Sequence, residues 1–89
     1  MGWKVKLSPE ARAHLAKMGA AQATRILRFL YDRLERRDDP REIGKPLKGS
    51  LREYWRYRVG DYRVICRLND EIVTVLVIRI GHRSKVYTL

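Results

Sequence analysis

Residues 57–65 of the chain read YRVGDYRVI, and the rest of the predicted fold is built around them. Two short runs of aromatic, β-branched and charged residues flank Gly60-Asp61, a pair that is typical of a two-residue turn in an antiparallel hairpin. If the turn contains only these two residues, Arg58 lies opposite Arg63 on one face of the hairpin. The stretch therefore predicts two paired strands with arginines gathered on one side.

The two faces of this predicted hairpin differ in chemistry. By the same parity, one face, called here the arginine face, carries Tyr54 and four arginines: Arg56, Arg58, Arg63 and Arg67. The other face carries residues expected in the core: Trp55, Tyr57, Val59, Tyr62, Val64, Cys66 and Leu68. Like charges opposite one another destabilise a sheet, whereas the rigid fork of arginine matches phosphate oxygens. The arginine face therefore favours an anionic ligand; the alternative is an ordinary solvated surface, and a turn with an odd number of residues would weaken the cluster.

Further strands extend this hairpin in both directions. We expect strands over residues 51–59, 62–68 and 71–80, with a second short turn at Asn69-Asp70. Residues 3–7 also alternate between apolar and charged side chains, which predicts a strand at the start of the chain. Strict alternation turns Arg79 toward the core, so either the last strand ends before it or a bulge turns it outward.

Two helices are predicted between the first strand and the hairpin. Ser8-Pro9-Glu10 supplies an N-cap, a proline at the first helical position and an acid in the first turn, and Gly19 is suited to end this helix. A longer helix over residues 21–36 has an apolar stripe made of Ala23, Ile26, Leu27, Leu30 and Leu34. Residues 37–49 lose this periodicity and carry turn chemistry.

These elements follow the order β-α-α-β-β-β over 89 residues. The length predicts a single domain over residues 1–89. The order predicts the α+β class, with a helical hairpin packed on one face of a small, antiparallel-dominated sheet.

The charge balance narrows the class of partner. Lys and Arg number 20 against 10 Asp and Glu, a formal net charge of +10. Nucleic acid, an anionic membrane surface or an acidic protein are the partners that such a charge favours. The single cysteine, Cys66, excludes an internal disulfide framework and a multi-cysteine zinc site, and no apolar run is long enough to span a membrane. We expect a cytoplasmic protein, because the N-terminal stretch MGWKVKLSPE has no apolar region typical of a secretion signal. We expect no metal or other cofactor, because the arginine face holds no acidic cluster suited to magnesium.

A short segment near the C-terminus gathers chemically useful side chains. Residues 81–87 read GHRSKVY. Here His82 and Tyr87 could exchange protons, Arg83 could stabilise charge on a phosphate, and Tyr87 could stack on an unpaired base. Each has an ordinary alternative: a surface histidine, a solvated Lys85, or a tyrosine that anchors the chain end.

Taken together, these motifs resemble the RelE family, the toxins of bacterial and archaeal toxin–antitoxin pairs. The resemblance covers nearly the whole chain and rests on the element order, on KPLKG at residues 45–49, on the hairpin stretch, and on IGHR at 80–83 with the later Val86-Tyr87. It implies a RelE-like fold and a metal-independent mRNA endonuclease that works in the ribosomal A site. In such members the ribose 2′-hydroxyl attacks the adjacent phosphate and leaves a 2′,3′-cyclic phosphate and a 5′-hydroxyl.

The resemblance also implies roles for individual residues. It assigns catalysis to Arg58, Arg63, His82, Arg83 and Tyr87, and phosphate binding to Lys48, Arg56, Arg67 and Lys85. Arg56 and Arg58 stand where well-studied members have lysines, and arginine cannot act as a general base near neutral pH. The base would then be His82, Tyr87 or a ribosomal RNA group.

The implied partners are mRNA in the ribosomal A site, ribosomal RNA and a cognate RelB-like antitoxin. Two alternatives remain open: a ParE-like inhibitor of DNA gyrase, which shares the fold but lacks the nuclease residues, and a non-catalytic RNA-binding or inactivated toxin. The presence of Arg63, Arg83 and Tyr87 favours the nuclease.

Overall fold

The hairpin predicted from residues 57–65 forms as expected at the centre of the sheet. The computed structural model describes residues 2–82. In it β3 (Tyr54–Val59) pairs antiparallel with β4 (Tyr62–Asn69), and Val59 lies opposite Tyr62 across the Gly60-Asp61 turn. The even turn length keeps every predicted pair, including Arg58 opposite Arg63.

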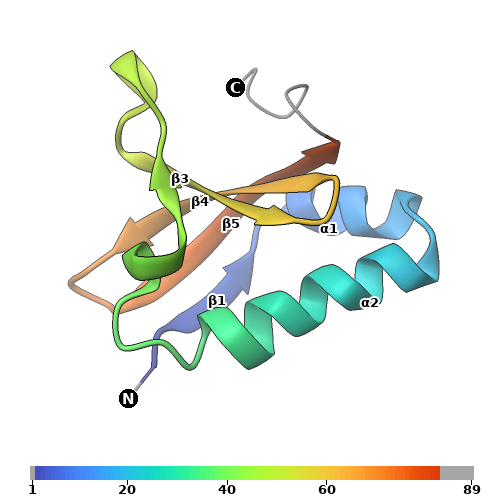
Figure 1. The fold of residues 1–89 in the computed structure, drawn as a ribbon, viewed down its shortest axis with the longest axis horizontal. Helices are drawn as coiled ribbons and strands as arrows, with labels where there is room; N and C mark the ends of the chain where they lie inside the picture. The colour runs from blue at the N-terminus through green and yellow to red at the C-terminus, as the bar shows by residue number, and fades with distance from the viewer. Residues whose placement is uncertain (1, 83–89) are drawn as a thin grey trace.

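Five strands make one mixed sheet in the order β1-β5-β4-β3-β2 (Figure 1). The edge strand β1 (Lys4–Leu7) runs parallel to β5 (Thr74–His82), and β5 pairs antiparallel with β4. The other edge strand, β2 (Lys45–Pro46), pairs antiparallel with β3 and was not predicted, since it is only two residues long. With both helices on one face of this sheet, the α+β class predicted from the element order is confirmed.

The first helix, α1 (Pro9–Lys17), begins at the predicted cap. The Ser8 hydroxyl accepts a hydrogen bond from Ala11 N at 3.0 Å and donates one to Ile78 O at 2.8 Å, so the same side chain caps the helix and ties it to β5. The helix ends at Lys17 with Met18 as its C-cap, shortly before the predicted stop at Gly19. Gly19 has an extended backbone with φ −62° and serves as the N-cap of the next helix.

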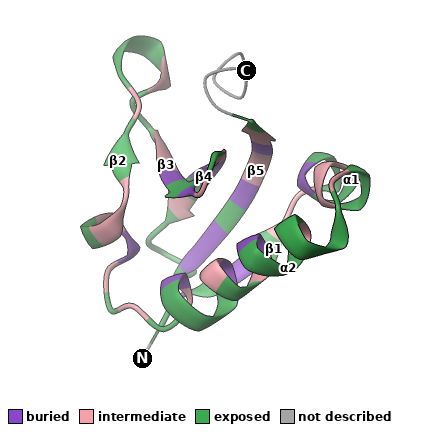
Figure 2. Ribbon diagram, turned by 45° about the vertical axis from the view of Figure 1, so that its right-hand side comes forward, coloured by how far each residue is buried: buried purple, intermediate pink, exposed green. Residues whose placement is uncertain are grey.

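The second helix changes its winding halfway along. It begins as α2 (Ala20–Arg28) and continues as the π-helical segment η1 (Phe29–Leu34). Three residues of the predicted apolar stripe are confirmed as core, since Ile26, Leu30 and Leu34 are fully buried against the sheet. Figure 2 shows the buried residues of this helix and of β5 facing one another across the core.

A β-bulge in β5 decides which way Arg79 points. The register with β4 shifts between Ile65 and Cys66, so Ile78 has no partner in β4 and Arg79 pairs with Ile65. Arg79 therefore turns away from the core. Its Nε donates a hydrogen bond to Glu10 Oε2 at 3.0 Å. The hydrogen bond from Arg79 lowers the pKa of the Glu10 carboxyl below its ordinary value. Of the two alternatives left open by the sequence, the bulge is the correct one.

The second hairpin turn is longer than predicted. Asn69 pairs with Thr74, which leaves four residues, 70–73, in the turn, and β5 begins at Thr74 rather than at residue 71. The Asn69 side chain accounts for the difference, because its Oδ1 accepts hydrogen bonds from the backbone N–H of Glu71 and Ile72. The shift is even, so it leaves the faces of β4 unchanged.

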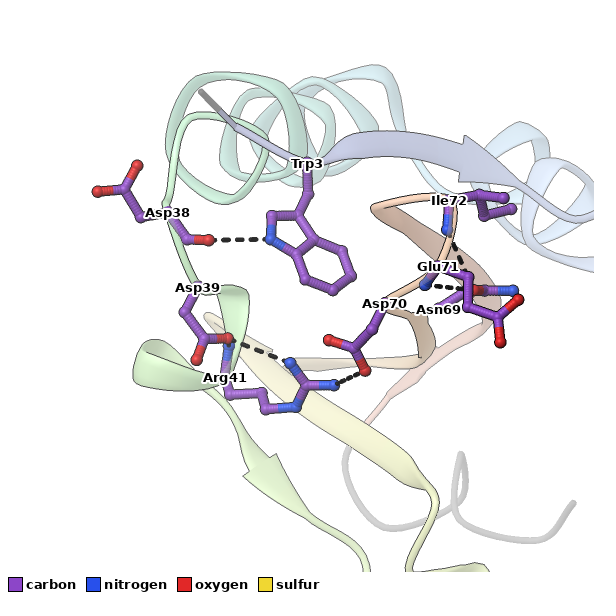
Figure 3. Close-up of polar contacts among 8 residues, drawn as sticks. All are labelled: Trp3, Asp38, Asp39, Arg41, Asn69, Asp70, Glu71 and Ile72. Atoms are coloured by element: carbon purple, nitrogen blue, oxygen red, sulfur yellow. Dashed lines mark hydrogen bonds and ion pairs between the residues drawn. The ribbon is translucent and has the colours of Figure 1, made fainter.

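The segment without periodicity is held in place by Arg41 (Figure 3). The Arg41 guanidinium lies 2.7 Å from Asp70 Oδ2 and 3.4 Å from Asp39 Oδ1, and it sits over the rings of Trp3 and Trp55 at 5.6 and 5.9 Å. These contacts join η2 (Pro40–Ile43), a 3₁₀ turn, to Trp3 just before β1, to β3 and to the turn between β4 and β5. Such long-range pairing leaves no local pattern in the sequence.

Candidate functional site

The arginine face lies on the side of the sheet opposite the helices. Its centre is the cross-strand pair of Arg58 on β3 and Arg63 on β4, next to Arg56 opposite Ile65. These three arginines, together with Lys45 and the backbone at Gly44, surround a hollow of about 170 Å³. The hollow has the size and charge to hold a phosphate group.

Arg63 is the most firmly positioned member of this set. It is half-buried, and its Nη1 donates to the carbonyl oxygens of Tyr62 at 3.2 Å and Gly60 at 3.4 Å. Arg58 is exposed. Within residues 2–82, neither guanidinium has a carboxylate oxygen within 4.0 Å. Two like charges thus face one another without compensation from the described part of the chain, which leaves both able to bind an external anion.

Two of the predicted phosphate-binding residues lie at the margins of this hollow. Lys48 is exposed beside a second hollow that Arg56 also lines, so these two side chains continue the basic surface along the β2 edge. Arg67 lies at the far end of the hairpin, opposite Tyr54. There its Nη2 is 3.2 Å from Glu53 Oε1, which neutralises its charge locally. The structure therefore places Lys48 beside Arg56, which also lines the hollow of the Arg58–Arg63 pair, and sets Arg67 apart.

The structure places His82 on the opposite face of the sheet from Arg63. Strand pairing sets His82 against Tyr62 and Gly81 against Arg63, so adjacent positions of β5 point to different sides. The imidazole packs edge-on against the Tyr62 ring with centroids 5.3 Å apart. His82 is therefore not brought together with the arginine pair. The remaining predicted residues, Arg83, Lys85 and Tyr87, lie outside the described residues.

Lys45 is a basic residue of this hollow that sequence reasoning did not select. It lies in β2 directly opposite Arg56. The preceding Gly44 allows this approach, because a β-carbon there would lie 2.6 Å from Cε1 of the Tyr57 ring. The Tyr57 hydroxyl in turn donates to Pro40 O at 2.9 Å and fixes the segment that leads into β2. The signal in the sequence was the KPLKG stretch, which reads as a turn because β2 is so short.

The chemistry available here is electrostatic. Guanidinium groups remain charged at all ordinary pH values, so they can bind a phosphate and stabilise negative charge that develops on it. Burial raises the pKa of both the Tyr57 phenol and the Cys66 thiol, so neither group is ionised at neutral pH. Among residues 2–82 there is no group of three or more His, Cys, Asp or Glu side chains that could hold a metal ion. In the same range, no helix combines the length and hydropathy of a membrane span.

The fold and a basic surface of this kind define the class of small α+β protein to which the chain belongs, and comparison with known proteins identifies its family. Residues 5–87 match the family model described as ParE toxin of type II toxin–antitoxin system, parDE. The chain belongs to this family and is a type II toxin of the RelE/ParE superfamily, as its resemblance to RelE predicted.

Individual relatives agree with this assignment. The chain is 32% identical over 87 residues to Toxin RelG of Mycobacterium tuberculosis, covering 98% of both chains, and 29% identical to Toxin RelE of the same organism, covering 98% of this chain and 88% of that one. Among solved structures it is similar to the toxin–antitoxin complex RelBE2 from M. tuberculosis, with TM-score 0.86, 31% identity and coverage of 93% and 100%. The archaeal RelE–RelB complex from Pyrococcus horikoshii gives TM-score 0.72 at 30% identity, covering 97% of this chain and 100% of that one.

Proposed function

We propose that this toxin is an mRNA endonuclease that acts in the ribosomal A site and binds the scissile phosphate on the arginine face. The observation that supports this most strongly is the directly opposed pair of Arg58 and Arg63, which has no carboxylate within 4.0 Å among residues 2–82. Two guanidinium groups in this arrangement match the oxygens of one phosphodiester. The similarity to Toxin RelG and Toxin RelE of M. tuberculosis also supports the nuclease proposal.

In the proposed reaction the ribose 2′-oxygen attacks the adjacent phosphorus. Its proton leaves to a base, the bond from phosphorus to the 5′-oxygen breaks, and that oxygen takes up a proton. The products are a 2′,3′-cyclic phosphate and a 5′-hydroxyl. Arg63 and Arg58 stabilise the extra negative charge of the pentavalent phosphorus, and a single preorganised donor of this kind contributes about 10²–10³ in rate.

The remaining roles follow from position and from family resemblance. Lys45, Lys48 and Arg56 bind the neighbouring backbone along the β2 edge. Arg83 stabilises the transition state and Tyr87 orients the target nucleotide, as the resemblance implies. Because His82 packs on Tyr62 across the sheet, the base is Tyr87 or a group of the ribosomal RNA. Positioning by the ribosome then supplies much of the barrier reduction.

The proposed protein partner is a RelB-like antitoxin in the cytoplasm. The solved complexes from M. tuberculosis and P. horikoshii each contain a toxin with its antitoxin. An acidic segment of such an antitoxin would neutralise the arginine face and block access of RNA. The net charge of +10 makes this attraction strong and dependent on salt.

Induced expression tests the proposed function against the gyrase alternative, which the ParE description of the family favours. The nuclease predicts growth arrest with mRNA 5′ ends that map inside reading frames and intact chromosomal DNA. Double-strand breaks trapped on gyrase, together with uncut mRNA, would establish the ParE-like activity instead. RNA binding without cleavage or growth arrest would identify an inactive toxin.

A further inference from the structure

A second basic hollow lies on the helix side of the hairpin turn, away from the arginine face. It has a volume of about 340 Å³, and its charged lining comes from the second helix and from the end of β3. The helix contributes Arg25, Arg28, Asp32 and Arg33, and the hairpin contributes Arg58. Four guanidinium groups therefore face one carboxylate in a single depression.

Within residues 2–82, the arginines of this hollow have no carboxylate counter-ion of their own. Arg37, Arg41, Arg67 and Arg79 elsewhere in the chain each form an ion pair with a carboxylate. Among residues 2–82, no such pair within 4.0 Å involves Arg25, Arg28 or Arg58, and Asp32 is equally unpaired. Clustered like charges raise the energy of the folded chain, and an external anion relieves it. The hollow is thus suited to an anionic ligand.

The turn between β3 and β4 joins this hollow to the arginine face. Gly60 has φ +60°, and a β-carbon there would lie 2.7 Å from Nη1 of Arg25, so this guanidinium rests against the Gly60 backbone. Arg58 lines both this hollow and the one on the arginine face. Arg58 therefore borders a cationic hollow on each side of the hairpin.

We propose that Arg25, Arg28 and Arg58 form a second phosphate-binding site, through which an RNA backbone continues from the arginine face around the hairpin turn onto α2. This proposal rests on the proposed function, because it takes the arginine face to hold RNA. The ligand is an RNA phosphodiester, either of the cleaved strand or of ribosomal RNA beside it. Because Arg58 lines both this hollow and the one on the arginine face, a single RNA strand could occupy both, and this favours RNA over a separate acidic polypeptide.

Replacing two of the arginines tests the site by its salt dependence. The variant Arg25→Gln/Arg28→Gln removes two exposed charges, and Arg12→Gln/Lys17→Gln on α1 is a matched control with the same change in net charge. The probe is a labelled single-stranded RNA of uniform 2′-O-methyl sugars, which cannot be cleaved, titrated at several salt concentrations. We expect the test variant to bind about tenfold more weakly and the slope of log K against log salt to fall by about 1.4, because each lost phosphate contact on a single strand accounts for about 0.7.

The control pair should change the affinity less than twofold and leave the slope nearly constant. Equal losses in both pairs would overturn the site, because they would show a general effect of charge. Arg25→Lys/Arg28→Lys should retain the slope and most of the affinity, which would exclude loss of folding as the cause. Unchanged RNA binding with weakened binding of an acidic antitoxin peptide would also overturn the proposal and assign the hollow to a polypeptide.

Ribosome assays separate this proposal from the nuclease. If the cleaved strand occupies the hollow, the free RNA probe shows the loss. If ribosomal RNA occupies it, the variant needs a higher concentration for half-maximal cleavage on ribosomes and shows a lower affinity for isolated ribosomal RNA than the control. A wild-type protein that never cleaves, but whose RNA affinity falls in the test variant, would support the site and refute the nuclease. Normal cleavage by the variant, with unchanged affinity for every RNA, would support the nuclease and refute the second site.

Discussion

Arg58 and Arg63 occupy opposed positions on neighbouring strands, yet their surroundings differ. Arg63 is half-buried and bound to two carbonyl oxygens of the turn, whereas Arg58 is exposed and borders two hollows. A fixed guanidinium stabilises a developing charge more than a mobile one does, because the entropy of orienting it is lost on folding and not during the reaction. Arg63 is therefore the residue on which the proposed chemistry depends most.

The first prediction concerns Arg63. Arg63→Ala should lower the single-turnover cleavage rate on ribosomes by at least about 10²-fold, the usual loss when one charge-stabilising donor is removed. The free energy of unfolding should fall by no more than about 1 kcal/mol, since only hydrogen bonds to turn carbonyls are lost. Arg12→Ala on α1 is the control. Full activity in Arg63→Ala would remove the residue from the proposed mechanism.

The second prediction concerns pH and the Glu10–Arg79 ion pair. The pKa of Glu10 is lower in the folded chain than its ordinary value of 4.5, so the ionised carboxylate stabilises the fold at neutral pH. This stabilisation is lost as the pH falls below 4.5 and through the lower pKa of the folded chain. Glu10→Gln should therefore be slightly less stable than the wild type near pH 7. The difference in melting temperature should vanish in acid. A constant difference over the whole range would show that the pair does not cause it.

At the scale of elements, the hairpin was predictable and the segment before it was not. Gly60-Asp61 lies between alternating strands, so local rules specify its turn, its register and the faces of its residues. The helix cap at Ser8 was equally local. By contrast, β2, with Lys45 opposite Arg56, depends on contacts that Arg41 and Tyr57 make with distant residues. No periodicity of the sequence records such contacts.

Strand parity also marked the limit of prediction within the candidate site. It placed Arg58 opposite Arg63 correctly, but the bulge at Ile78 changes the parity of β5. The bulge turns Arg79 to the arginine side and leaves His82 beside Tyr62 on the other face. A chemical inventory of residues 81–87 could not foresee this separation, because the bulge depends on pairing with β4.

The third prediction concerns the Arg41 clamp at this scale. Arg41→Ala removes a guanidinium that pairs with Asp39 and Asp70 and covers Trp3 and Trp55. The loss should destabilise the fold by about 1–3 kcal/mol, because carboxylates and indole faces lose a common partner. Denaturant unfolding followed by tryptophan fluorescence measures it. Arg41→Lys should recover only part of the loss, since lysine lacks the planar fork; full recovery would contradict this account of the clamp.

At the scale of the whole molecule, charge dominates the expected behaviour. Twenty basic residues stand against ten acidic ones, and under the proposed function this excess charge would attract the toxin to the ribosome while the arginine face makes the final contact. The fourth prediction is that association with ribosomes weakens steeply and linearly on a log–log plot as salt rises. A binding constant that does not change with salt would show that apolar contacts, not phosphate contacts, hold the complex.

The central claim is that the Arg58–Arg63 pair is where an RNA phosphate reacts. The most direct measurement is single-turnover cleavage of end-labelled mRNA on purified, programmed ribosomes, comparing the wild type with Arg58→Ala/Arg63→Ala and with Arg12→Ala/Lys17→Ala. We expect cut ends bearing 2′,3′-cyclic phosphate from the wild type and the α1 control, and no cleavage from the arginine-pair variant although it remains folded. Undiminished cleavage by that folded variant, or no cleavage by the wild type, would contradict the claim.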